Sequence, residues 1–165
     1  KGLKNENIGL GNEGAINQLI AHHSIIFKPE QKMFWISTTP YQIGPYVCYQ
    51  LDSVFNKNHP PLFSSDIKNN FISADSIFLQ NQFPQFLQFK SFKDQINQHE
   101  IVDIEKLINS NPHYFYTYEL AGDDALLQSD SIKAIEYYKM ARHYFIPNQH
   151  EVNRINKKAE ELKDN

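Results

Sequence analysis

Hydrophobic positions in the first half of the chain follow the two-residue period of β-strands. The runs 19–27 and 33–38 are rich in β-branched and aromatic residues, and a short polar stretch containing Pro29 separates them. Two such runs predict an antiparallel hairpin. The run 46–51 predicts a further strand. Because both faces of the first run carry apolar residues, we expect both faces of the sheet to be covered by other parts of the protein.

The second half of the chain has the 3.6-residue period of helices. Residues 74–92 predict a helix broken at Pro84. A short helix follows Asp103, a typical N-cap, and ends before Pro112. The apolar spacing and the capping signals predict further helices over 113–127, 132–145 and 149–163, with Asn148 as the N-cap of the last. The Pro and Asn content of 56–70 predicts a loop.

Two of these predicted helices match one tetratricopeptide unit. The matching positions alternate small and aromatic residues at the spacing of that repeat and are closed by a proline. Small residues allow two helices to approach, and aromatic residues fill the space beside them. The match predicts either a peptide-binding groove or a single helical hairpin docked on its own domain. The residues are Tyr118, Gly122, Ala134, Tyr138, Ala141 and Pro147.

Composition excludes several classes of protein. The chain has 165 residues, of which 41% are hydrophobic, which is enough for one domain or two small ones. A net charge of -3 argues against sequence-independent binding of nucleic acid. Apolar runs are too short for a membrane-spanning helix. The single cysteine, Cys48, excludes an internal disulfide, and we expect it to be a buried apolar residue.

Candidate chemistry is sparse. His22, His23 and Ser24 form a polar triplet in the first predicted strand, where adjacent side chains point to opposite faces and so do not share one metal ion. They are expected either to make structural hydrogen bonds or to line a pocket. Asp123 and Asp124 are expected to be solvated. No metal site and no cofactor site is predicted.

A glycine pattern near the start of the chain has the spacing of a dinucleotide-binding loop. The residues Gly9-Leu10-Gly11-Asn12-Glu13-Gly14 match G-x-G-x-x-G. No strand of adequate length precedes them, and no acidic residue follows at the required distance. We therefore reject a dinucleotide site. Four aromatic residues further along, Tyr114, Phe115, Tyr116 and Tyr118, are expected to form a buried helical face rather than a base-stacking surface.

The first half of the chain resembles a known family of hydrolases. Residues 12–27, Asn-Glu-Gly-Ala-Ile-Asn-Gln-Leu-Ile-Ala-His-His-Ser-Ile-Ile-Phe, are followed by Met-Phe-Trp-Ile-Ser-Thr at 33–38 and Pro-Tyr-Gln-Ile-Gly at 40–44. This pattern resembles the C-terminal part of bacterial penicillin-acyltransferase-like proteins. They are N-terminal-nucleophile hydrolases, related to choloylglycine hydrolases and to acyl-CoA:6-aminopenicillanic acid acyltransferase. Members with a tetratricopeptide-like tail are similar to this chain almost throughout.

The resemblance implies an αββα sandwich and a cysteine nucleophile exposed by self-cleavage. The free α-amine of that cysteine would act as base toward its own thiol, which would attack an amide or thioester carbonyl. This sequence starts with Lys1, and Cys48 lies in a segment that matches a late strand of the family. No residue here carries over as the nucleophile. The resemblance places His22, His23 and Ser24 near the substrate pocket, with no chemical role assigned.

These observations predict an α+β chain in three parts. Residues 1–70 hold the last strands of the sandwich and a loop, 71–110 hold connecting helices, and 111–165 hold the tetratricopeptide-like tail. The expected function is the C-terminal segment of a self-processing hydrolase or acyltransferase that acts on non-peptide amide or thioester bonds, with its upstream part as partner and with no activity of its own. The alternative is a non-enzymatic module whose helices bind a partner peptide. Localisation depends on sequence before Lys1.

Overall fold

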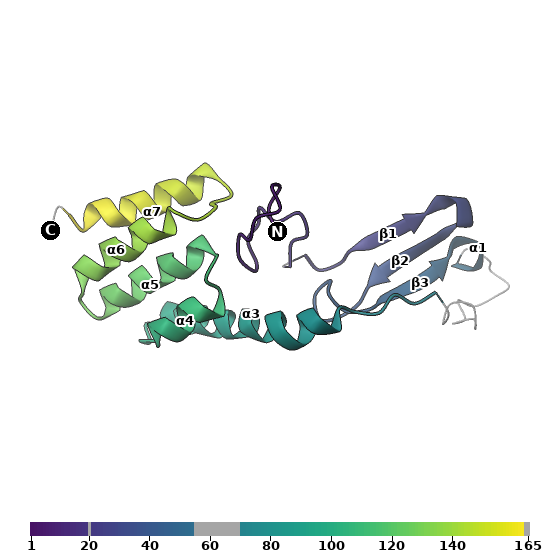
Figure 1. Ribbon diagram of the computed structural model, residues 1–165, viewed down its shortest axis with the longest axis horizontal. Helices are drawn as coiled ribbons and strands as arrows, with labels where there is room; N and C mark the ends of the chain where they lie inside the picture. The colour runs from purple at the N-terminus through teal and green to yellow at the C-terminus, as the bar shows by residue number, and fades with distance from the viewer. Residues whose placement is uncertain (20, 55–69, 164–165) are drawn as a thin grey trace. The chain divides into compact units, whose positions relative to one another are not determined.

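The secondary structure is α+β. The computed structural model describes residues 1–19, 21–54 and 70–163, and Figure 1 shows strands in the first half of the chain and helices in the second. The predicted loop over 56–70 lies outside the described residues except at Asn70. The chain divides into two compact units, which are described separately below.

The division into units differs from the three predicted segments. Leu19–Gln80 form one unit, here called the sheet unit. Lys1–Gln18 and Asn81–Asn165 form the other, here called the helical unit. The first residues of the chain therefore belong with the helices and not with the strands, because side chains of the N-terminal segment are hydrogen-bonded to the helical unit.

The sheet unit contains a three-stranded antiparallel sheet in the order β1-β2-β3. The strands are β1 (Ile25–Lys28), β2 (Met33–Ser37) and β3 (Tyr46–Gln50). The predicted hairpin and third strand are confirmed. A 3-10 turn at Pro29–Gln31 connects β1 to β2, and the short helix α1 (Leu51–Val54) follows β3.

Strand β1 is shorter than the predicted run 19–27. Ladder pairing begins where the Ser37 N–H donates to the Ser24 carbonyl. Strand β2 ends at Ser37, and the turn that follows, closed by hydrogen bonds from the Ile43 N–H to the Pro40 carbonyl and from the Gly44 N–H to the Thr38 carbonyl, leads back into β3. Within the described residues, those before Ser24 therefore have no partner strand at this edge, and a strand is stable only where its backbone groups are paired.

Helix α3 (Ser76–Asn97) runs through Pro84, so the predicted break is wrong. Proline removes the N–H that would donate to the carbonyl four residues earlier, at Gln80. Gln80 and Pro84 are both exposed, so water can satisfy that carbonyl. Burial of Phe86, Phe89 and Ile96 further along holds the rest of α3 against the helical unit.

The remaining helices are confirmed, with one end corrected. Asp103 and Asn148 cap two of them through their side chains, as expected, and Asp130, predicted only as part of a break, caps a third. The helix predicted over 132–145 ends at Ala141 and not at Phe145, because the N–H groups of Arg142, His143 and Tyr144 donate to carbonyls three residues earlier and not four. The helices are α4 (Ile104–Ser110), α5 (Phe115–Leu127), α6 (Ser131–Ala141) and α7 (Gln149–Glu161).

Helices α5 and α6 pack as a close pair around a small residue. Gly122 lies against the ring of Tyr138, and a Cβ at this glycine would collide with that ring. Ala134 and Ala141 are fully buried beside it. Among the predicted aromatic residues Phe115 and Tyr118 are buried and Tyr114 and Tyr116 are half-buried, which confirms the buried helical face.

The N-terminal segment is anchored to the helical unit. The Leu10 N–H donates to Asn111 Oδ1 at 2.9 Å, and Asn111 Nδ2 donates to the Leu10 carbonyl at 2.8 Å. Asn12 is fully buried and donates to the carbonyls of Ile8 and Phe145. The bonds to Asn111 and to Phe145 join residues that are more than a hundred positions apart.

We expect Asn12→Ala to release this segment. The change removes the donor to the buried Ile8 carbonyl and to the partly buried Phe145 carbonyl, and unpaired buried polar groups are costly. Limited proteolysis should then cut residues 1–18 several-fold faster than in the wild type, while residues 81–163 stay resistant. Asn17→Ala, at an exposed position of the same segment, is the matched control. Equal cleavage of Asn12→Ala and wild type would contradict the anchoring role.

Among the described residues, no helix has both the length and the apolar character required to cross a membrane.

The cap of α6 predicts a pH dependence of stability. The pKa of Asp130 is lowered by the hydrogen bond from the Lys133 backbone and by the Lys133 side chain. A group whose folded-state pKa is lowered contributes stability above its unfolded pKa of about 3.9, and this contribution is lost as the pH falls through the folded-state value. The stability difference between wild type and Asp130→Ala should therefore shrink on acidification.

Urea unfolding between neutral pH and about pH 2 measures this difference. Asn148→Ala removes a cap that does not titrate, because the capping group is an amide. The oxygen of this amide accepts from the Glu151 N–H at the start of α7. Its effect on the free energy of unfolding should be independent of this titration. A difference in unfolding free energy between wild type and Asp130→Ala that stays constant from neutral pH to about pH 2 would show that the Asp130 carboxylate does not cause the pH dependence.

Candidate functional site

One face of the sheet is apolar and partly exposed in the part of the chain that the structure describes. The pairing register places Ile25 beside Ile36 and Phe27 beside Phe34. It also places Phe34 beside Tyr49. We call this surface the Phe34 face; its residues are Ile25, Phe27, Phe34, Ile36, Val47 and Tyr49.

The rings of the Phe34 face form a row across the strands. The centroids of Phe27 and Phe34 are 6.2 Å apart, and those of Phe34 and Tyr49 are 5.1 Å apart, both in stacked orientation. Phe27 is 66% exposed and Ile25 is 50% exposed, while the other members of the face are half-buried. Contiguous apolar surface of this kind marks an interaction site.

The opposite face of the sheet is buried on β2 and β3 at Trp35, Ser37 and Cys48, and exposed on β1. Trp35, Ser37 and Cys48 have less than a tenth of their surface exposed. The Trp35 indole N–H donates to the Asn70 carbonyl, so the chain after β3 contributes to covering this side. The two faces therefore differ: one is closed within the unit, and the other presents aromatic and aliphatic side chains outward.

The structure places the predicted polar triplet just before β1. His22 and His23 are exposed, and neither lies in a strand, so the prediction that they alternate within one is wrong. Ser24 is half-buried, and its N–H donates to the Ser37 Oγ at 2.8 Å. Within the described residues, no group of three His, Cys, Asp or Glu side chains has metal-binding geometry. That His22, His23 and Ser24 line a pocket stays a prediction.

The environment of Cys48 does not suit a nucleophilic thiol. It lies in the middle of β3, opposite Trp35, and is 2% exposed. Burial raises the pKa of the thiol, which keeps it protonated at neutral pH. The expectation of a buried apolar cysteine is confirmed.

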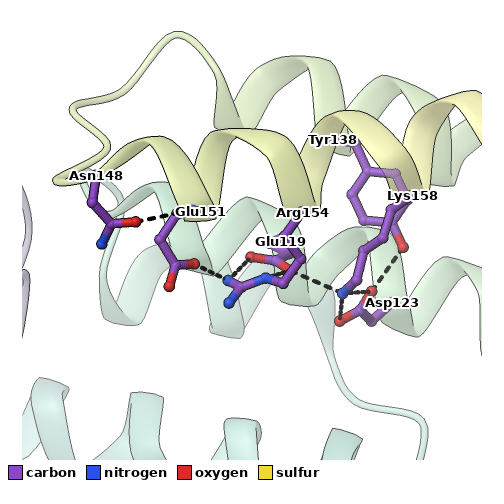
Figure 2. A network of polar contacts seen from close by, with 7 residues as sticks. All are labelled: Glu119, Asp123, Tyr138, Asn148, Glu151, Arg154 and Lys158. Carbon is purple, nitrogen blue, oxygen red and sulfur yellow. Dashed lines mark hydrogen bonds and ion pairs between the residues drawn. The ribbon is translucent and has the colours of Figure 1, made fainter.

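A network of charged side chains joins α5 to α7. Figure 2 shows Glu119 and Asp123 on α5 facing Arg154 and Lys158 on α7, with Tyr138 of α6 at one end. Arg154 donates to Glu119 through Nε at 2.9 Å and through its second terminal nitrogen at 2.6 Å. Lys158 contacts Glu119 at 2.9 Å and Asp123 at 2.8 Å.

The charged groups of this network are partly or fully buried and compensate one another. The Glu119 side chain is 1% exposed, and its charge is compensated by Arg154, which also pairs with Glu151. The hydrogen bond with Glu119 raises the pKa of Arg154. For Lys158, desolvation acts to lower the pKa, but hydrogen bonds to Asp123 and Glu119 outweigh it and raise the pKa.

The tyrosine at the end of the network is held in its neutral form. Desolvation raises the pKa of the Tyr138 phenol, and the hydrogen bond that it donates to Asp123 at 2.7 Å raises it further. Tyr138 therefore acts as a donor within the helical unit. The network fixes α7 on α5 and leaves its cations paired.

The expectation that Asp123 and Asp124 are solvated is wrong. Asp124 is fully buried and accepts from the Val102 N–H at 2.8 Å and from the Gln128 side chain. Asp123 is part of the charged network. The two carboxylates have different partners, as expected for consecutive helical residues. Their burial depends on contacts with distant segments, which local sequence does not reveal.

The glycine pattern near the start of the chain serves packing. Gly9 and Gly11 have positive φ angles of 85° and 81°. A Cβ at Gly9 would collide with Tyr114, and one at Gly14 with Phe145. These glycines let the N-terminal segment approach the helices closely.

Comparisons with known proteins add no relative. The chain matches no protein-family model, no curated protein and no solved structure. The candidate site is therefore defined by its own residues: an uncovered apolar sheet face in one unit and an internally paired charge network in the other.

Proposed function

We propose that this chain is the C-terminal segment of a self-processing hydrolase or acyltransferase of the N-terminal-nucleophile type. Its substrates would contain non-peptide amide or thioester bonds, and its nucleophilic cysteine would be supplied by sequence before Lys1. The resemblance over residues 12–55 motivates this proposal. The observation that supports it best is the uncovered Phe34 face of the sheet.

An αββα sandwich needs two sheets that pack through apolar inner faces about 10 Å apart. The Phe34 face has the aromatic and aliphatic composition of such an inner face. On the other side of the same sheet, Trp35, Ser37 and Cys48 are already buried. One covered and one uncovered apolar side is what a single sheet of a sandwich presents when its partner sheet is not attached.

The chemistry would then come from outside the described residues. A Cys thiol activated by its own free α-amine would attack the carbonyl carbon, and the amine or thiol of the substrate would leave. Cys48 does not fill this role, because its thiol is buried and stays protonated. We therefore predict that the isolated chain shows no turnover.

The alternative, a peptide-binding module, has weaker support. In that function the helices α5 and α7 would present free polar groups to a partner. Glu119 is buried, and its partners Arg154 and Lys158 are also paired with Glu151 and Asp123. The α5 and α6 pair matches the tetratricopeptide pattern, and we propose that it docks on its own domain.

The test uses the gene that encodes the chain. We predict an in-frame segment before Lys1 with a cysteine at a self-cleavage junction. The complete product should turn over amide or thioester substrates, lose turnover when that cysteine is replaced by alanine, and keep it in Cys48→Ala. A stop codon directly upstream would contradict the proposal and favour the binding module. Turnover by the isolated chain would also contradict the proposal, but it would not favour the binding module.

A further inference from the structure

Strand β1 has an open edge. In an antiparallel ladder, residues alternate between those whose backbone groups bond to the neighbouring strand and those whose groups point away. The Ser37 N–H donates to the Ser24 carbonyl, which makes these two residues a hydrogen-bonded pair. It follows that Ile26 and Lys28 also bond to β2, and that the N–H and C=O groups of Ile25 and Phe27 point outward.

The opposite edge of the sheet is engaged. The N–H of Tyr46 donates to the Ile72 carbonyl, and the N–H of Ile72 donates to the Tyr46 carbonyl. On β1, by contrast, no described residue bonds to the outward groups of Ile25 and Phe27. Both faces of this edge are also apolar, with Ile25, Ile26 and Phe27 between 43% and 66% exposed.

We propose that two copies of the chain pair through β1, antiparallel and with Ile26 on the two-fold axis. In this register Ile25 of each copy lies opposite Phe27 of the other. Those are the two residues whose N–H and C=O groups point outward, so each pair exchanges both hydrogen bonds. The arrangement is isologous, as two-fold contacts are.

The side chains fit the same register. Ile25 meets Phe27 on the Phe34 face, and Ile26 meets its own counterpart on the Trp35 side, so the exposed apolar residues of β1 gain cross-strand neighbours. Lys28 lies opposite Ser24, and no like charges face each other. A register centred on Phe27 would place Ile25 opposite Pro29, which has no N–H to donate. The register centred on Ile26 therefore best satisfies the outward N–H and C=O groups of the β1 edge.

The pairing is independent of the proposed function, because it uses the edge of the sheet and not the Phe34 face as a whole. Its small contact predicts a weak, concentration-dependent dimer. A cross-link can trap it. Ile26 on the axis would be a non-hydrogen-bonded pair with Cα atoms about 4.5 Å apart, within the range that a disulfide bridges.

The experiment compares two single-cysteine variants in the Cys48→Ala background. With the oxidant diamide, Ile26→Cys should give several-fold more disulfide-linked dimer than Ile25→Cys, whose counterpart lies beyond disulfide reach in this register. Adding Ile25→Pro to Ile26→Cys should abolish the cross-link, since proline removes an outward N–H that a free edge does not need. Adding Ile25→Thr should preserve it.

Equal cross-linking of Ile26→Cys and Ile25→Cys would overturn the proposal, as would a cross-link that survives Ile25→Pro. Circular dichroism of each variant confirms that the sheet is intact. Turnover by the complete gene product reports the proposed function separately, so failure of one idea leaves the other measurable.

Discussion

Glu119→Ala is expected to lower the free energy of unfolding by about 1–3 kcal/mol. The carboxylate is 1% exposed and is bonded to both Arg154 and Lys158. Removing it leaves two cations facing each other in a partly buried site, each with one negative partner fewer. Arg154 keeps Glu151 and Lys158 keeps Asp123, and the two cations are 36% and 32% exposed, which limits the loss.

Urea unfolding followed by far-UV circular dichroism measures this loss. Lys157→Met is the matched control: Lys157 lies on the same helix as Arg154, and its contact with Glu161 is long, at 3.7 Å, and exposed. Exposed pairs contribute about 0–1 kcal/mol, so this control should unfold close to wild type. A Glu119→Ala loss no larger than that of the control would show that the network does not hold α7.

Gly122→Val is expected to destabilise the chain by about 1–3 kcal/mol through overpacking. Valine has a better helix propensity than glycine, so an isolated helix would gain stability from this change. Here any Cβ collides with the ring of Tyr138, which is fully buried and also donates to Asp123. Separation of α5 and α6 is the direct consequence.

A double-mutant cycle isolates the collision. In the Tyr138→Leu background, where the ring is gone, Gly122→Val should be neutral or stabilising. Chemical denaturation of the four proteins gives the coupling free energy between the two positions. If Gly122→Val costs the same in both backgrounds, the close approach of α5 and α6 is not what requires glycine.

The sequence predicts those features that depend on near neighbours. Asp103 and Asn148 cap helices as expected, because a cap is decided by contacts within three residues. The hairpin of β1 and β2 follows from strand alternation and a short polar loop. These patterns are local, and few tertiary contacts compete with them.

Features that depend on distant contacts were not predictable. Arg154 and Glu119 are 35 positions apart, and Leu10 and Asn111 are 101 apart. Nothing in the local pattern marks Glu119 as buried, because its partners come from a different helix. The same holds for α3, where burial of Phe86 and Phe89 outweighs the local effect of Pro84. Tertiary packing overrides propensity at these places.

The candidate site was predicted in part. Apolar residues on both faces of the first strand indicated that the sheet needs covering on both sides. The register then showed which face is closed and which is open, since Trp35 and Cys48 share the buried side. Sequence alone does not separate these faces, because Phe34 and Trp35 are both large aromatic residues.

The central claim is that the Phe34 face is covered by a second layer of the same protein. Val47→Cys in the Cys48→Ala background places a thiol on that face, away from the β1 edge. The measurement is its rate of alkylation in the isolated chain and in the complete gene product. The account predicts rapid labelling in the isolated chain and strong protection in the complete product; equal rates in both would contradict it.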